Sequence, residues 1–173
     1  MTQYGEPFVV ASPHRRRHGA RSLVLIVGAP VAAILFQVYV PRFFGYLSYL
    51  EPPLLVTVYF ALMRRQPMAG VFYGAAVGLV QDSLSHQPLG MFGIVKTLVG
   101  YFAASVSQRF DVESPLVRFL LGFFFFFFHQ FFYWVLVRAL LGQALEFDPA
   151  RTALFGLMNA AIAVPLFHLL DRL

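Results

Sequence analysis

The sequence contains no cysteine and few charged residues. Of its 173 residues, 59% are hydrophobic and only 12% are charged, and the mean hydropathy is +0.70. Without cysteine, the chain can form no disulfide, no thiolate metal site and no cysteine nucleophile. Few soluble domains have such a composition, so it predicts an integral membrane protein.

The sequence also lacks the residue patterns of catalysis and metal binding. It has no serine, histidine and aspartate set in a recognisable context, no phosphate-binding glycine loop, and no carboxylate pair within an apolar segment. The five histidines are scattered, and the one pair spaced four apart, His14 and His18, lies in an arginine-rich tail. We therefore expect no enzyme activity, no metal and no cofactor.

Arginine, proline and polar clusters divide the apolar sequence into six segments, and a membrane-spanning helix needs about 20 residues. The segments are residues 22–40, 52–63, 68–85, 88–106, 119–137 and 152–170. The second is short, so it either extends back over residues 46–51 through a proline kink or forms a broken, partly re-entrant helix. We favour a crossing. The sequence thus predicts an all-α, polytopic membrane bundle of about six helices, residues 22–173, after a basic cytoplasmic tail, residues 1–21.

The basic residues predict the orientation of this bundle. With six crossings and a cytoplasmic N-terminus, nine arginines lie in the cytoplasm and only Arg42, Arg138 and Arg151 lie outside, as the positive-inside rule requires. Without the second crossing, Arg109 and Arg118 would lie on the wrong side. The net charge of +5 comes from these flanking residues. It therefore suggests contact with anionic lipid headgroups and not with nucleic acid.

A stripe of small residues ends in a carboxylate on the third segment. Gly70, Gly74, Gly78 and Asp82 are spaced four apart, so a helix places all four on one face. Small residues at this spacing let another helix approach closely within a membrane. Asp82 is therefore expected to face the inside of the bundle.

Lys96, the only lysine, lies in the middle of the fourth segment. An ionisable side chain at that depth costs about 2.5 to 3.5 kcal/mol on insertion scales, so it usually has a partner or a hydrated cavity. Asp82 is the candidate counter-charge, directly or through a shared water, because the third and fourth segments are joined by a short connection. Either the two charges are structural, paired or separately solvated, or they bind a ligand or partner.

Polar and aromatic residues also interrupt the last two segments. We expect hydrogen bonds from helix to helix among His129, Gln130 and Asn159. The run of six phenylalanines, residues 123–128, is poor in the small residues that favour close packing, so we expect most of it on the outside of the bundle.

Several short motifs between residues 51 and 104 match those of a known family. EPPLLVTVYFALMRR has a proline at the start of the second segment and an aromatic-Ala-Leu sequence before its arginines. GLVQDSLSHQPLGMFGIVKTLVGYFAA has Gly-Leu-x-x-Asp ending the third segment, Pro-Leu-Gly opening the fourth and Gly-Tyr near its end. These motifs, the length and the basic N-terminus resemble the bacterial rod shape-determining protein MreD family. His86 and Lys96 are departures from the family pattern.

The resemblance implies a non-enzymatic component of the bacterial inner membrane that helps to position peptidoglycan synthesis and to maintain rod shape. Its implied partners are MreC directly, and through it MreB and a synthase pair of RodA and a class B penicillin-binding protein. The implied fold is that of the membrane substrate-binding subunits of vitamin transporters, with an outward pocket. The candidate residues for structure or partner contact are Gly70, Gly74, Gly78, Asp82, Pro88, Gly90, Lys96 and Tyr101.

The alternative function is a small-molecule-binding membrane subunit of a transporter. In that case Asp82, Lys96, Tyr101 and Asn159 would hold a polar ligand in the outward cavity.

Overall fold

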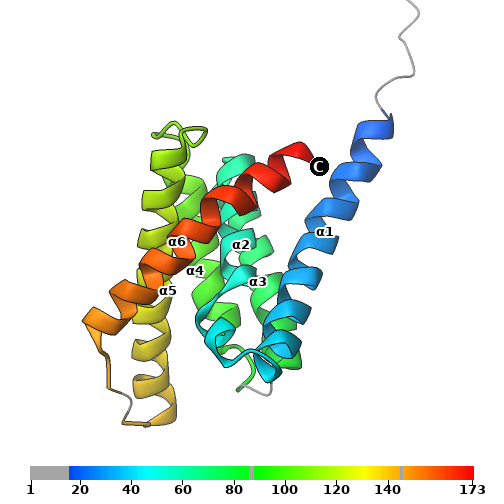
Figure 1. Cartoon of the computed structure of the whole chain (residues 1–173). Helices are drawn as coiled ribbons and strands as arrows, with labels where there is room; N and C mark the ends of the chain where they lie inside the picture. Colours follow the sequence, from blue (N-terminus) through cyan, green and yellow to red (C-terminus); the bar gives the residue numbers. More distant parts are fainter. Residues whose placement is uncertain (1–15, 86–87, 145) are drawn as a thin grey trace, which may run out of the picture.

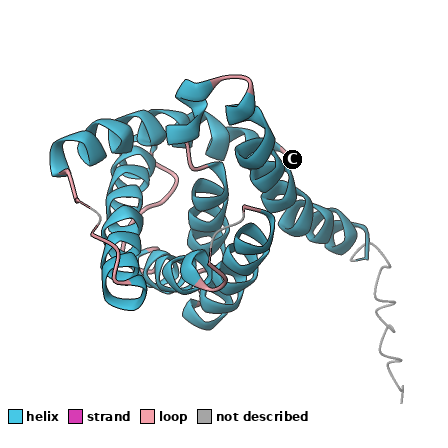
Figure 2. Ribbon diagram, turned by 90° about the horizontal axis from the view of Figure 1, so that it is seen from below, coloured by secondary structure: helices cyan, strands magenta, loops and turns pink. Residues whose placement is uncertain are grey.

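The computed structural model describes residues 16–85, 88–144 and 146–173, and the described residues form helices and turns with no strand (Figure 2). The elements in chain order are α1 (Arg16–Tyr39), η2 (Val40–Arg42), η3 (Gly45–Tyr49), α2 (Pro52–Arg64), α3 (Pro67–Leu84), α4 (Met91–Val106), α5 (Pro115–Leu141) and α6 (Pro149–Arg172). Residues 1–15 of the predicted tail lie outside the described residues, and the rest of the tail belongs to α1.

Successive α-helices run in alternating directions, so the start of α1 and the end of α6 lie at the same end of the bundle (Figure 1). We call this the basic end, because α2 also ends there at Arg64 and α5 begins there before Arg118. The opposite end holds the connections around η2 and η3, between α3 and α4, and between α5 and α6. Helix α1 leans away from the others toward its N-terminus (Figures 1 and 2).

Each of the six predicted segments corresponds to a helix, and α1, α5 and α6 extend beyond their predicted bounds. The starts of α2 and α4 also differ from the prediction. Helix α2 begins at Pro52, where a first-turn proline needs no hydrogen-bond donor. The preceding η3 is a separate 3₁₀ turn and Leu50 is extended, so α2 does not continue back through a kink. Helix α4 begins at Met91, three residues later than predicted, because Gly90 has a φ of 97°.

Three described helices are long and apolar enough to cross a membrane: Val24–Arg42, Pro115–Leu141 and Pro149–Arg172. Met91–Val106 is a shorter apolar helix. The structure is therefore the predicted all-α membrane bundle.

The short helix α2 forms the centre of the bundle. Its residues from Pro53 to Tyr59 are all buried, as are Ala61 and Leu62, which is the pattern of a helix surrounded by other helices. It packs against α1, α3 and α4.

The phenylalanine run of α5 does not lie mostly outside. Phe125 and Phe126 are 0% and 1% exposed, and only Phe124 is largely exposed. Consecutive helical residues point about 100° apart, so six in a row surround the helix, and the prediction for this run was wrong.

Candidate functional site

The glycine stripe of α3 packs directly on the backbone of α4. Gly70, Gly74 and Gly78 are all buried. A methyl group added to Gly70 would overlap the carbonyl of Gly100, and one added to Gly74 would overlap that of Lys96. The predicted close approach is confirmed, and its partner is the adjacent helix α4.

Asp82 ends this stripe and caps the N-terminus of α4. Its Oδ2 accepts hydrogen bonds from the backbone N–H groups of Gly90 (2.9 Å) and Gly93 (3.1 Å), and its Oδ1 accepts one from Phe92 (3.0 Å). The first N–H groups of a helix have no partner within it and carry a partial positive charge. The buried carboxylate of Asp82, on the neighbouring helix, provides acceptors for these N–H groups and a negative charge opposite the partial positive charge.

The direct pair predicted between Asp82 and Lys96 is not formed. Within the described ranges the one ion pair joins Arg118 to Asp171. The carboxylate of Asp82 instead binds backbone donors at the start of α4. Almost every residue carries a backbone N–H group, so the sequence does not single out these three donors as the partners of Asp82.

Lys96 is fully buried and reaches helix α5. Its Nζ lies 3.3 Å from Nε2 of His129 and 4.6 Å from the centre of the Phe92 ring. An ammonium group can only donate, so Nε2 of His129 accepts and its proton is on Nδ1. That Nδ1 atom is buried and has no hydrogen-bond partner among the described residues.

Glu51, which immediately precedes the second predicted segment, is a buried acid. It is 7% exposed, and its Oε2 atom has no hydrogen-bond partner in the described part of the chain. Glu51, Asp82 and Lys96 thus place two acids and one base in the buried part of the bundle. Because α2 is short, the residue just before it, Glu51, lies inside the bundle and not beyond its end.

Asn159 fixes the segment that leads into α2. Its Oδ1 accepts from the backbone N–H of Glu51, and its Nδ2 donates to the carbonyl oxygens of Tyr49 and Phe155, all at 2.9 Å. Among the described residues, Asn159 therefore bonds to the segment before α2 and His129 to Lys96 on α4, and not to each other or to Gln130 as predicted.

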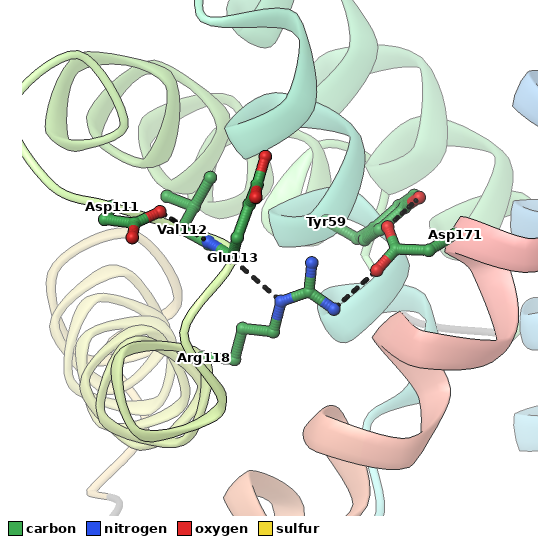
Figure 3. Close-up of polar contacts among 6 residues, drawn as sticks. All are labelled: Tyr59, Asp111, Val112, Glu113, Arg118 and Asp171. Atoms are coloured by element: carbon green, nitrogen blue, oxygen red, sulfur yellow. Dashed lines mark hydrogen bonds and ion pairs between the residues drawn. The ribbon is translucent and has the colours of Figure 1, made fainter.

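A second polar cluster lies at the basic end (Figure 3). Arg118, 4% exposed, donates from Nη1 to Oδ2 of Asp171 (2.6 Å) and from Nε to the carbonyl oxygen of Val112 (2.8 Å). The Tyr59 hydroxyl donates to Oδ1 of the same aspartate (2.9 Å). The cluster joins α2, α5 and α6. Arg118 entered the sequence analysis only as a flanking charge, although the predicted topology places it at the same end of the bundle as Asp171.

Two further candidate residues, Tyr101 and Pro88, lie at the surface of the bundle. Tyr101 is 43% exposed and contacts the ring of Phe102, and Pro88 is exposed in the turn before α4. A cavity of about 360 Å³ does open at the opposite end between α5, α6 and η3, next to Gln130 and Arg151. Neither Asp82, Lys96, Tyr101 nor Asn159 lines it.

These features define an integral membrane bundle in which buried polar side chains hold helices together. Among the described residues, no group of three histidine or carboxylate side chains gathers as a metal site would require. The chain belongs to the rod shape-determining protein MreD family, whose model matches residues 20–173. This membership confirms the resemblance and assigns the chain a role in rod shape determination. No curated protein and no solved structure matches the chain.

Proposed function

We propose that this chain is a non-enzymatic scaffold of the cell-elongation machinery in the bacterial inner membrane. It binds MreC, and through MreC it acts with MreB and with RodA and its class B penicillin-binding protein to position peptidoglycan synthesis. Family membership over residues 20–173 carries the proposal.

The use of the buried polar groups supports a structural role. Both carboxylate oxygens of Asp82 bind the start of α4, and the amide of Asn159 is used entirely by backbone partners. Both carboxylate oxygens of Asp171 are likewise engaged. Groups engaged in this way hold helices in register and are not free to act on a substrate.

The arginine distribution supports a cytoplasmic N-terminus. The basic end carries Arg64, Arg65, Arg109, Arg118 and Arg172, whereas the opposite end carries Arg42, Arg138 and Arg151. Adding the arginines at the start of α1 widens the difference, and the side richer in arginine faces the cytoplasm.

Depletion of the protein from rod-shaped cells tests the role in shape. We expect the cells to become round and wild-type protein to restore rods. Gly28→Ala should restore them equally well, because a methyl group there meets no atom within 4 Å. Cells that keep their rod shape after complete depletion would contradict the proposal.

Purification from the membrane separates the scaffold from its alternative. A stoichiometric single-span partner with a large extracytoplasmic domain supports the scaffold, and a bound vitamin-like molecule with an ATPase module supports a transporter subunit. The cavity beside Arg151 is the observation that favours the alternative. Against the transporter alternative, the four residues expected to hold the ligand, Asp82, Lys96, Tyr101 and Asn159, do not line this cavity.

A further inference from the structure

A cavity of about 510 Å³ opens at the basic end, between residues 25–26 of α1 and the last turns of α2 and α6. Its apolar lining includes Leu25 and Ile26 of α1, Phe60 and Met63 of α2, and Leu170 of α6. This volume is within the range of small-molecule sites in proteins. The apolar lining continues onto the exposed surface of α1, where Val24 and Val27 are 70% and 61% exposed.

Two arginines line the same cavity, Arg64 at the end of α2 and Arg172 at the end of α6. Both are exposed, and neither forms an ion pair with any residue that the structure describes. The cavity therefore combines two cationic groups with an apolar wall.

Among the described residues, Asp171 is the one acidic side chain that lines this cavity, and it is already paired. One carboxylate oxygen accepts from Arg118 and the other from Tyr59 (Figure 3). Since Arg118 is buried and holds Asp171 in place, this carboxylate is paired with neither Arg64 nor Arg172. The polar cluster thus leaves a net positive charge at the mouth of the cavity.

We propose that this cavity binds one anionic glycerophospholipid from the leaflet at the basic end. Its phosphate lies between Arg64 and Arg172, and an acyl chain lies against Leu25, Ile26 and Leu170. A guanidinium group offers paired donors that match phosphate oxygens. Arginines at helix ends also reach the headgroup level of a bilayer, where anionic lipids attract them.

Native mass spectrometry of the full chain, released from detergent with phosphatidylglycerol or phosphatidylcholine of identical acyl chains, tests the site. We expect the wild-type protein to retain one phosphatidylglycerol in preference to phosphatidylcholine. Arg64→Gln and Arg172→Gln should each weaken this retention about fivefold, and the double variant about twenty-five-fold. The matched control is Arg109→Gln, which removes an exposed arginine from the same end but not from the cavity, and should bind like the wild type.

Three results would overturn the proposal. Equal retention of both lipids would mean that the cavity binds acyl chains without regard to charge. An equal loss in Arg109→Gln would mean that the whole basic end attracts anionic lipid. Displacement of the lipid by millimolar inorganic phosphate would identify a site for free phosphate rather than for a lipid headgroup. Circular dichroism of each variant checks that the helices are intact.

Discussion

The hydroxyl group of Tyr73 on α3 donates a hydrogen bond to the carbonyl oxygen of Ile26 on α1, at 3.1 Å. Pro30 lies four residues after Ile26 inside α1 and has no N–H to offer that carbonyl. The tyrosine therefore satisfies a backbone group that proline leaves without its helical partner. It also joins α1 to α3, two helices that otherwise make few contacts with each other.

This relationship predicts that the effect of Tyr73→Phe depends on residue 30. In the wild-type background the variant should lower the free energy of unfolding in detergent by about 0.6 kcal/mol, the average for hydrogen bonds between membrane helices, and by no more than about 1.7 kcal/mol. In a Pro30→Ala background the loss should shrink, because the new N–H can bond to Ile26. Equal losses in both backgrounds would show that the tyrosine does not serve this carbonyl.

Substitution of the stripe glycines should separate α3 from α4. Gly74→Ala places a methyl group on the carbonyl of Lys96, so we expect a loss of about 1 to 3 kcal/mol in stability. Gly28→Ala is the control in α1, where nothing lies within 4 Å, and it should leave stability unchanged or slightly raised. Thermal unfolding of the two purified variants in the same detergent gives the comparison.

Removal of the Asp82 carboxylate should weaken the start of α4. Asp82→Ala leaves three backbone donors without their acceptor, and we expect a cost of about 2 kcal/mol or more. Asp82→Asn should cost less, since the amide keeps one accepting oxygen. Ser83→Ala is the neighbouring control, because its exposed hydroxyl bonds only to the carbonyl of Leu79 in its own helix. Hydrogen exchange of residues 90–93 measures the effect locally.

A pair of double-mutant cycles distinguishes the observed partner of Lys96 from the expected one. Lys96→Met combined with His129→Phe should be non-additive by more than about 0.5 kcal/mol, because the two side chains are in contact. Lys96→Met combined with Asp82→Asn should show the smaller coupling, because only a longer-range charge interaction joins them. A larger coupling energy between Lys96 and Asp82 than between Lys96 and His129 would instead support a direct Asp82–Lys96 pair.

Disruption of the cluster at the basic end should loosen three helices together. Arg118→Ala is expected to cost about 2 to 3 kcal/mol, somewhat below the usual cost of breaking a buried pair, because the Asp171 side chain is 34% exposed. Tyr59→Phe should cost about 1 kcal/mol for its single hydrogen bond. Arg109→Ala, an exposed arginine at the same end, should change unfolding by less than about 0.5 kcal/mol. A result in which the variants of Arg118 and Arg109 behave alike would contradict the role of the cluster.

Regular spacing made much of the fold predictable. Segment lengths and prolines placed the six helices, and the four-residue spacing from Gly70 to Asp82 correctly oriented one face of α3. Both arguments depend only on neighbours along the chain, which is why they succeeded without a structure.

Contacts between distant residues were not predictable in the same way. Lys96 and His129 are 33 residues apart, and Arg118 and Asp171 are 53 apart, so no local pattern links them. The alternating topology would have placed Arg118 and Asp171 at one end, and this was the available indication of their pairing. Nothing comparable was available for Lys96, whose flexible side chain can turn toward any neighbouring helix.

The cap that Asp82 provides has a consequence for how the protein enters the membrane. During synthesis α3 leaves the ribosome first, and its carboxylate has no donors until residues 90–93 follow. A single helix with an unpaired acid inserts poorly into a membrane. Helix α3 is also not among the three described helices that are long and apolar enough to cross a membrane. We therefore expect α3 and α4 to insert as a hairpin. Nascent chains truncated before residue 90 should leave α3 extractable by alkali, whereas chains that include α4 should not.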